Sequence, residues 1–113
     1  MTIAEVHQAN TEALRKIEEC RRLGKKGTKL DLSDLRLTTL PPAIGQLTAL
    51  TELVLWGNQL TTLPPELGQL TALRELFLAG NPLQEPPLEV AKQGVATIRR
   101  YFADRAKSGT ELL

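Results

Sequence analysis

The chain has 113 residues, of which 42% are hydrophobic, as expected for one soluble globular domain. Fourteen basic and 13 acidic residues leave a formal net charge of +1. This balance argues against a protein built mainly to hold the phosphate backbone of nucleic acid. Cys20 is the only cysteine, so an internal disulfide is excluded and a reducing, cytoplasmic location is favoured.

No targeting or membrane segment is predicted. The first ten residues carry polar and acidic side chains where a signal peptide would need an unbroken apolar stretch. No apolar run approaches the roughly 20 residues that a membrane-spanning helix needs. We therefore expect neither a membrane nor a nucleic-acid partner.

Residues 2–23 predict an amphipathic helix. Its apolar residues follow one helical face: Ile3, Val6, Ala13, Ile17 and Cys20. Thr2 with Glu5 three residues later forms a capping-box pattern, and Gly24 stands where a helix commonly ends. Because the apolar face needs a surface to cover, we expect this helix to be an N-terminal cap on the segment that follows.

Residues 28–88 repeat themselves with a period of 23. The leucines that recur are Leu30, Leu53 and Leu76, and then Leu32, Leu55 and Leu78. Residues 50–60 and 73–83 both follow the pattern L-x-x-L-x-L-x-x-N-x-L, by which the chain resembles the leucine-rich repeat family. The resemblance implies an α/β fold: a short right-handed solenoid, with a small parallel sheet on its concave face and a helical cap at each end.

Within each repeat, the alternation of inward-facing and outward-facing side chains predicts one short parallel strand. In residues 52–56 the two leucines point inward while Glu52, Val54 and Trp56 point outward. Asn58 and Asn81 fall where the chain turns off the strand, and we expect their buried amides to form a structural ladder between repeats. The first repeat has Leu35 at this position. Proline at positions 64 and 65 limits the return segment to short or irregular helical turns.

Residues 89–107 predict a C-terminal helical cap, with Val95, Ile98 and Phe102 on one face. We thus expect one domain over residues 1–113. The order NPLQEPPLEV, then glycine, then IRRYF resembles the segment that closes the repeat domain of bacterial Roco-type proteins, before their GTPase domain. Here Tyr101 and Ala106 stand where a phosphate loop requires glycine, so no GTPase is encoded.

Two groups of basic residues are interpreted as solvated side chains rather than phosphate sites. The first group lies at the end of the predicted N-terminal helix and comprises Arg21, Arg22, Lys25, Lys26 and Lys29. The second is the pair Arg99 and Arg100 in the C-terminal helix.

The outward strand positions predict a binding face. They align as three rows: Lys29, Glu52 and Glu75; Asp31, Val54 and Phe77; Ser33, Trp56 and Ala79. We expect Trp56 and Phe77 to be apolar anchors, and the carboxylates to form an acidic rim that favours a basic protein surface. The predicted partner-binding residues are Asp31, Ser33, Glu52, Val54, Trp56, Glu75, Phe77 and Ala79. In the alternative, Trp56 folds over the strand edge or lies under a cap and only packs.

The sequence gives little support to a catalytic function. His7 is the sole histidine and has no metal-like spacing to other ligands, and Cys20 has no predicted base partner. We expect no cofactor and no metal, and interpret the chain as a non-enzymatic protein–protein interaction module. Two alternatives stay open: a regulatory or docking part of a Roco-like GTPase system, and a self-associating structural module.

Overall fold

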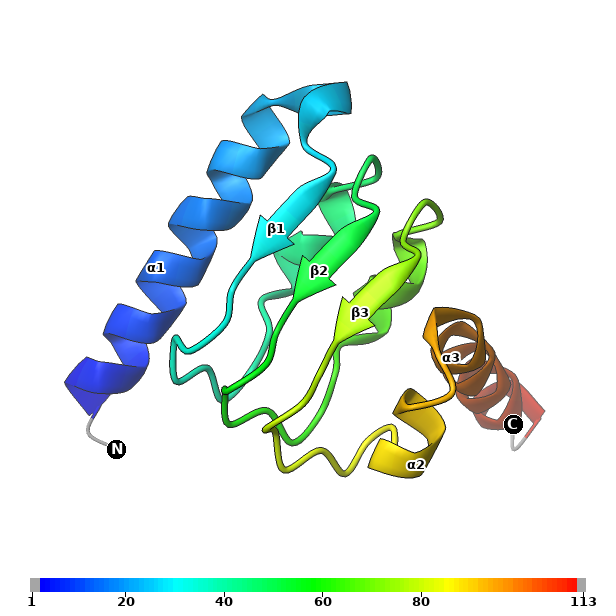
Figure 1. The fold of residues 1–113 in the computed structure, drawn as a ribbon. Coiled ribbons are helices and arrows are strands. Elements are labelled where there is room, and N and C mark those ends of the chain that lie inside the picture. Colours follow the sequence, from blue (N-terminus) through cyan, green and yellow to red (C-terminus); the bar gives the residue numbers. More distant parts are fainter. Residues whose placement is uncertain (1–2, 112–113) are drawn as a thin grey trace.

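The computed structural model describes residues 3–111, with side chains placed from residue 10 to residue 104. A three-stranded parallel sheet lies in front of two 3₁₀ helices, and longer helices flank it on both sides (Figure 1). In chain order the elements are α1 (Ile3–Arg22), η1 (Gly24–Lys26), β1 (Lys29–Asp31), η2 (Pro42–Gln46), β2 (Glu52–Val54), η3 (Pro65–Gln69), β3 (Glu75–Phe77), α2 (Leu88–Ala91) and α3 (Val95–Glu111).

The sheet has the order β1-β2-β3 and the register expected from the 23-residue period. Lys29 pairs with Glu52 and Glu52 with Glu75, so each residue lies beside its counterpart in the next repeat. The inward leucines of the strands meet the apolar side chains of η2 and η3, where Ile44 and Leu67 are buried. Each fully buried leucine contributes about 1.5–3 kcal/mol to stability. The three parallel strands and their register are therefore confirmed.

The turns after the strands are held by buried asparagines. Asn58 Oδ1 accepts hydrogen bonds from the backbone N–H groups of Leu35 and Leu37, each at 3.0 Å, and its Nδ2 donates to the Leu32 and Leu55 carbonyls at 2.9 Å. Asn81 makes the corresponding donations to the Leu55 and Leu78 carbonyls. Each amide thus joins its own turn to the preceding repeat.

A left-handed backbone position also recurs with the repeat. Gly57 and Gly80 have φ values of 72° and 76°, and Asp34, one period earlier, has φ 54°. Aspartate tolerates this region better than most residues. A Cβ at Gly57 would lie 2.0 Å from Asp34 Oδ1, so glycine is required there for space as well as for conformation.

Helix α1 packs against β1 and η2. Ala13, Ile17 and Cys20 on its inner face are buried, whereas Leu14 is 47% exposed. The helix ends near Gly24, whose φ is 57°. The predicted Thr2 cap lies outside the described residues, and the structure places no side chains for Ile3, Glu5 or Val6.

The C-terminal segment differs from the single helix expected over residues 89–107. The chain forms the short helix α2, passes through Gly94 with φ 109°, and then begins α3. This φ suits glycine and interrupts helical geometry, so two helices form in place of one. Helix α3 packs against α2 and η3. Arg99 is not solvated as expected: its guanidinium donates to the carbonyls of Leu70 and Leu73.

None of the helices within residues 3–111 combines the length and the apolar character needed to cross a membrane.

Candidate functional site

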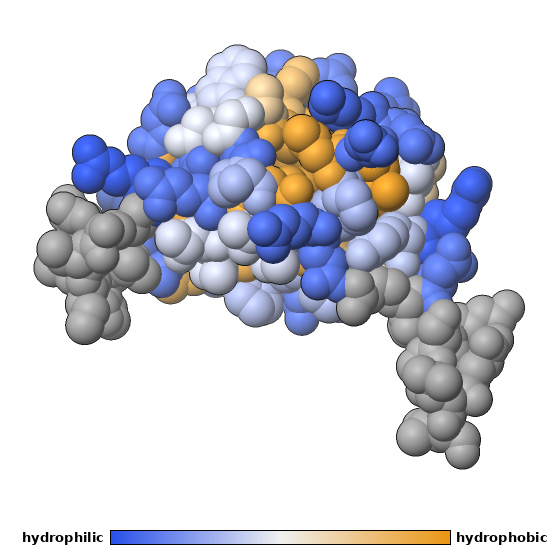
Figure 2. Space-filling view, turned by 90° about the horizontal axis from the view of Figure 1, so that it is seen from below, coloured by the Kyte–Doolittle hydropathy of each residue, from blue (hydrophilic) through white to orange (hydrophobic). Residues whose placement is uncertain are grey.

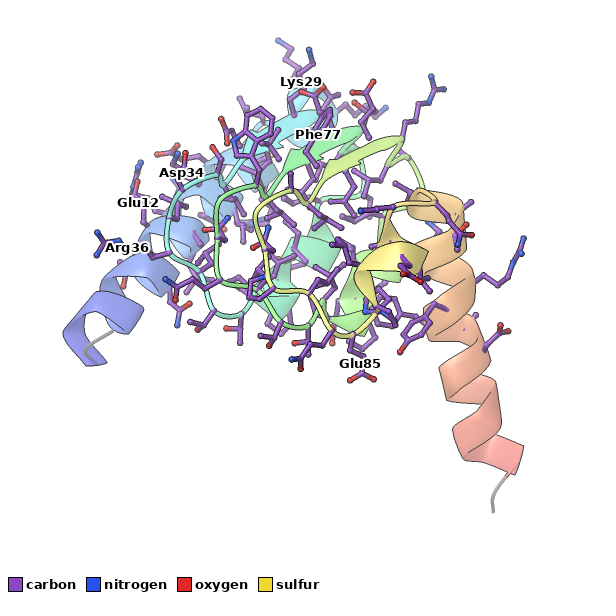
Figure 3. The ribbon with its side chains drawn as sticks, turned by 60° about the horizontal axis from the view of Figure 1, so that its bottom comes forward. Glu12, Lys29, Asp34, Arg36, Phe77 and Glu85 are labelled. Carbon is purple, nitrogen blue, oxygen red and sulfur yellow. The ribbon has the colours of Figure 1, made fainter. Side chains whose placement is uncertain are left out.

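The open face of the sheet carries all eight residues predicted to bind a partner. Strand pairing places Asp31, Val54 and Phe77 in one row, with Glu52 and Glu75 in the row before it. Figure 3 shows Phe77 and Lys29 on the same side of the molecule, with Glu85 projecting from the opposite side. We call this surface the sheet face.

Two aromatic rings form the centre of the sheet face. The Trp56 and Phe77 ring centroids lie 6.0 Å apart with an interplanar angle of 53°, within the range of favourable tilted aromatic pairs. Trp56 is 46% exposed and Phe77 is 37% exposed. The terminal helices therefore leave Trp56 partly exposed.

The charges on the sheet face are mainly acidic. A hydrogen bond from the Ser33 side chain, aided by the Ser33 backbone N–H, lowers the pKa of Asp31. Asp31 is therefore ionised at neutral pH. Within residues 10–104, neither Glu52 nor Glu75 has an ion-pair partner, and the ion pairs that form lie along α1. These carboxylates are available to a cationic group on a partner.

An apolar groove of about 470 Å³ adjoins the two rings. Leu76, Leu88 and Ala91 contribute apolar side chains to it, and Lys92 adds a cation. The complete lining is Trp56, Leu76, Phe77, Leu78, Ala79, Gly80, Leu88, Ala91, Lys92 and Gly94. In the space-filling view, hydrophobic surface is exposed near the centre of the molecule and is bordered by hydrophilic side chains (Figure 2).

The sequence predicted the residues that line this groove from the strands, but not those that line it from α2 and the residue after it. Trp56, Phe77 and Ala79 followed from the alternation of the strands. Leu88, Ala91 and Lys92 did not, because their part in the groove depends on where α2 lies against β3. The only local signal was the break in the leucine pattern at residues 86–94.

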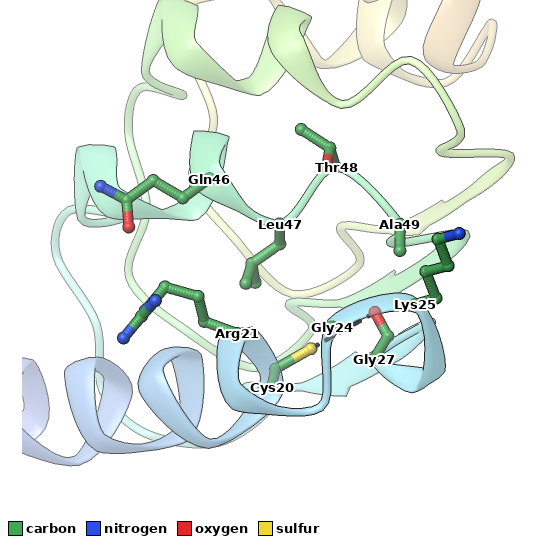
Figure 4. Close-up of a pocket in the computed structure, with 9 residues that line it drawn as sticks. All are labelled: Cys20, Arg21, Gly24, Lys25, Gly27, Gln46, Leu47, Thr48 and Ala49. Carbon is green, nitrogen blue, oxygen red and sulfur yellow. Dashed lines mark hydrogen bonds between the residues drawn. The ribbon is translucent and has the colours of Figure 1, made fainter.

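A second hollow, of about 220 Å³, lies at the end of α1 and is lined by Cys20, Arg21, Lys25 and Leu47 among others (Figure 4). The Cys20 Sγ donates a hydrogen bond to the Gly27 carbonyl at 3.5 Å. Burial raises the pKa of this thiol, so Cys20 is protonated at neutral pH and is a poor nucleophile. A Cβ at Gly27 would lie 2.4 Å from the Cys20 carbonyl oxygen. These contacts pack the end of α1 against the first repeat.

The basic cluster beside this hollow is partly neutralised. Arg21 lies 2.5 Å from Glu18, and their hydrogen bond lowers the Glu18 pKa to about 2. Arg22 lies 3.4 Å from the same carboxylate. Among the residues that the structure describes, no group of three or more His, Cys, Asp or Glu side chains is placed to hold a metal ion.

Comparison with known proteins identifies the repeated segment. Residues 28–83 match the family model for the leucine rich repeat. A solved structure of an LRR protein from Leptospira interrogans is 33% identical to this chain, with a TM-score of 0.44. The alignment covers 54% of this chain and 25% of that one, so this chain corresponds to only a quarter of that protein. Residues 28–83 are thus similar to leucine-rich repeats, which generally serve as protein–protein interaction modules.

Proposed function

We propose that this protein is a non-enzymatic protein–protein interaction module that binds a protein partner through the sheet face. In this proposal the repeats form a short solenoid whose concave side is the sheet face, α1 caps its first repeat, and α2 with α3 caps its last. The contiguous and exposed pair Trp56–Phe77 carries the proposal. Large aromatic side chains beside a groove are the residues that most often dominate the binding energy of an interface.

The charges around the rings support a basic partner surface. Asp31, Glu52 and Glu75 lie on the same face as the two rings and have no cationic side chain paired with them among the described residues. Complementary charges of this kind increase association rates and select the orientation of the partner. We place the interaction in the cytoplasm, since the one-cysteine composition suits a reducing compartment.

The test is affinity capture of partners from native extract with the wild-type protein and a Trp56→Ala, Phe77→Ala double variant. The matched control is Leu14→Ala, which removes an apolar side chain that is 47% exposed on α1. Circular dichroism and thermal unfolding check that each variant is folded. Specific loss of one captured protein from the aromatic variant is expected. Equal capture by the wild-type protein and both variants would exclude the sheet face as the site.

A second candidate function rests on the order of residues 81–102, which resembles the segment before the GTPase domain in Roco-type proteins. In this alternative the chain is a regulatory or docking part of a Roco-like GTPase system. Association with a separate GTPase domain that changes between the GDP and GTP states would support it. Binding that is insensitive to the nucleotide would favour the general interaction module.

A further inference from the structure

The outer edges of β1 and β3 differ in how their backbone groups are covered. Helix α1 packs along β1, the Lys16 ammonium donates to the Asp31 carbonyl at 3.5 Å, and the Asp31 side chain accepts the Ser33 N–H. The outer edge of β1 is thus covered by a helix and its polar groups are engaged. An edge strand that lacks such protection is available for pairing with another chain.

The outer edge of β3 keeps backbone groups that can pair. The Phe77 and Ala79 carbonyls accept hydrogen bonds from the residues that follow β2, from Leu55 N–H at 2.8 Å and from Gly57 N–H at 2.9 Å. Alternate residues of a parallel strand direct their backbone groups to opposite sides. The N–H and C=O of Leu76 and the N–H of Leu78 therefore point away from β2.

The burial of the strand leucines agrees with this open edge. Leu30 and Leu53 are 7% and 0% exposed, respectively. Leu76, one period later and in register with them, is only partly buried and lines the apolar groove. The lining of the groove joins residues of β3 to Leu88, Ala91 and Gly94. The helix α2 lies on the side of β3 away from β2 (Figure 1). An apolar channel therefore follows the unpaired backbone.

We infer that this groove receives an extended segment of a partner protein, which pairs with β3 as a fourth strand. This inference rests on the proposed function and names the form of the partner. Alternate side chains of the segment would be apolar and contact Phe77, Leu88 and Ala91. A basic side chain would lie beside Glu75 and Glu52 at the start of the strands. Strand addition draws affinity from the main chain and specificity from pockets for alternate side chains.

The probe is the synthetic peptide acetyl-Ser-Lys-Val-Leu-Val-Lys-Ser-amide, with its affinity measured from the emission of Trp56. Trp56 is the only tryptophan and lines the groove, so a bound segment changes its surroundings directly. The peptide has the same order of side chains from either end, so it suits a parallel or an antiparallel fourth strand. Saturable binding is expected, whereas no saturable binding at millimolar peptide would overturn the inference.

Two N-methylated peptides test whether the backbone pairs. One is methylated on the central leucine and the other on both valines, so each removes N–H donors from one side of the extended segment. A strand that pairs with β3 uses one side only. One methylated peptide should therefore bind about tenfold more weakly than the parent peptide, as loss of interfacial hydrogen bonds predicts, while the other keeps its affinity. Equal affinities, or equal losses, would overturn the inference.

A matched pair of protein variants separates the groove from the rest of the sheet face. Leu88→Ala shortens a side chain in the wall of the groove, and Val90→Ala changes the same short helix at a residue outside the lining. The peptide should bind Leu88→Ala more weakly than Val90→Ala, and equal affinities would count against the groove. If the natural partner is lost from the Trp56, Phe77 variant but the peptide tests fail, the sheet face stays the site and only strand addition is wrong.

Discussion

At the scale of single residues, the two buried asparagines occupy equivalent turns, but their amide oxygens accept different numbers of backbone hydrogen bonds. The Asn58 amide oxygen accepts two backbone N–H groups of the first repeat. The Asn81 amide oxygen accepts the Leu60 N–H at 3.1 Å. Asn58 is 4% exposed and Asn81 is 8% exposed. Asn58 therefore compensates for the absence of an asparagine in the first repeat by satisfying the turn at residues 35–37.

We expect Asn58→Ala to lower the free energy of unfolding substantially. The buried backbone groups of Leu32 and Leu37 and the partly buried N–H of Leu35 would lose their side-chain partner, and each unsatisfied buried group costs about 1–3 kcal/mol. Urea unfolding followed by circular dichroism measures the change. The control is Gln59→Ala, at the exposed next residue. Similar midpoints for the two variants would show that the Asn58 hydrogen bonds contribute little.

The sequence predicted the place of these asparagines, because the period and the turn pattern are local information. It did not predict the role of Asp34, because aspartate, unlike Gly57 and Gly80 at the corresponding positions, does not by itself indicate a positive φ. Arg99 was also missed. Its hydrogen bonds reach residues 26 and 29 positions earlier in the chain, and no local pattern records such a contact.

At the scale of elements, the 3₁₀ helices η2 and η3 have nearly the same sequence in different surroundings. Gly45 in η2 faces η3, where an added Cβ would lie 3.0 Å from both the Cβ and the carbonyl oxygen of Glu66. Gly68 in η3 is the counterpart of Gly45, and an added Cβ there would meet nothing within 4 Å. The glycine of the IGQL sequence is thus needed for close approach, and that of LGQL is not.

This difference predicts opposite effects of the same substitution. Gly45→Ala should destabilise the protein by about 1–3 kcal/mol through overpacking between η2 and η3. Gly68→Ala should be neutral or stabilise it by up to about 1 kcal/mol, because alanine restricts the unfolded chain. Thermal unfolding of both variants is the measurement. A Gly45→Ala variant as stable as Gly68→Ala would show that the two helices can separate without loss.

Arg99 joins α3 by hydrogen bonds to the residues that follow η3. Its guanidinium donates to two carbonyls, and its Nε is buried with no partner among the described residues. We expect Arg99→Ala to destabilise the packing of α3 by about 1.5–3 kcal/mol, the usual contribution of a hydrogen bond to a charged group. Hydrogen exchange of the α3 amides reports this loss, with the exposed Arg100→Ala as the control. Equal exchange in both variants would assign Arg99 a solvated role.

The elements themselves could be predicted from the sequence more completely than the contacts between them. A fixed period aligns β1, β2 and β3 without further information, so the register and the neighbouring positions of Trp56 and Phe77 could be predicted. The break at Gly94 and the position of α2 could not, because both depend on packing against the last repeat. Half of the candidate groove was for that reason absent from the sequence-based prediction.

At the scale of the whole molecule, one side of the sheet is closed by α1 and the other carries the groove. A second copy of the chain could in principle pair there, but the helices beside β3 and the carboxylates of Glu52 and Glu75 would face their own counterparts. We therefore expect static light scattering to give the monomer mass of 12.4 kDa at low and high concentration. A mass that rises with concentration, and falls again in the Trp56, Phe77 variant, would favour the self-associating module.

The regular spacing of the repeats has a consequence for how the protein folds. Its inter-repeat hydrogen bonds join residues 21 to 26 positions apart, so each new strand closes a loop of nearly the same length. The entropy of closing such a loop grows only slowly with length, as about 1.5RT times the logarithm of the number of residues. No step therefore needs a much more distant contact than the step before it. Strand pairing can begin at either pair of neighbouring repeats and propagate along the chain, as in other one-dimensional arrays.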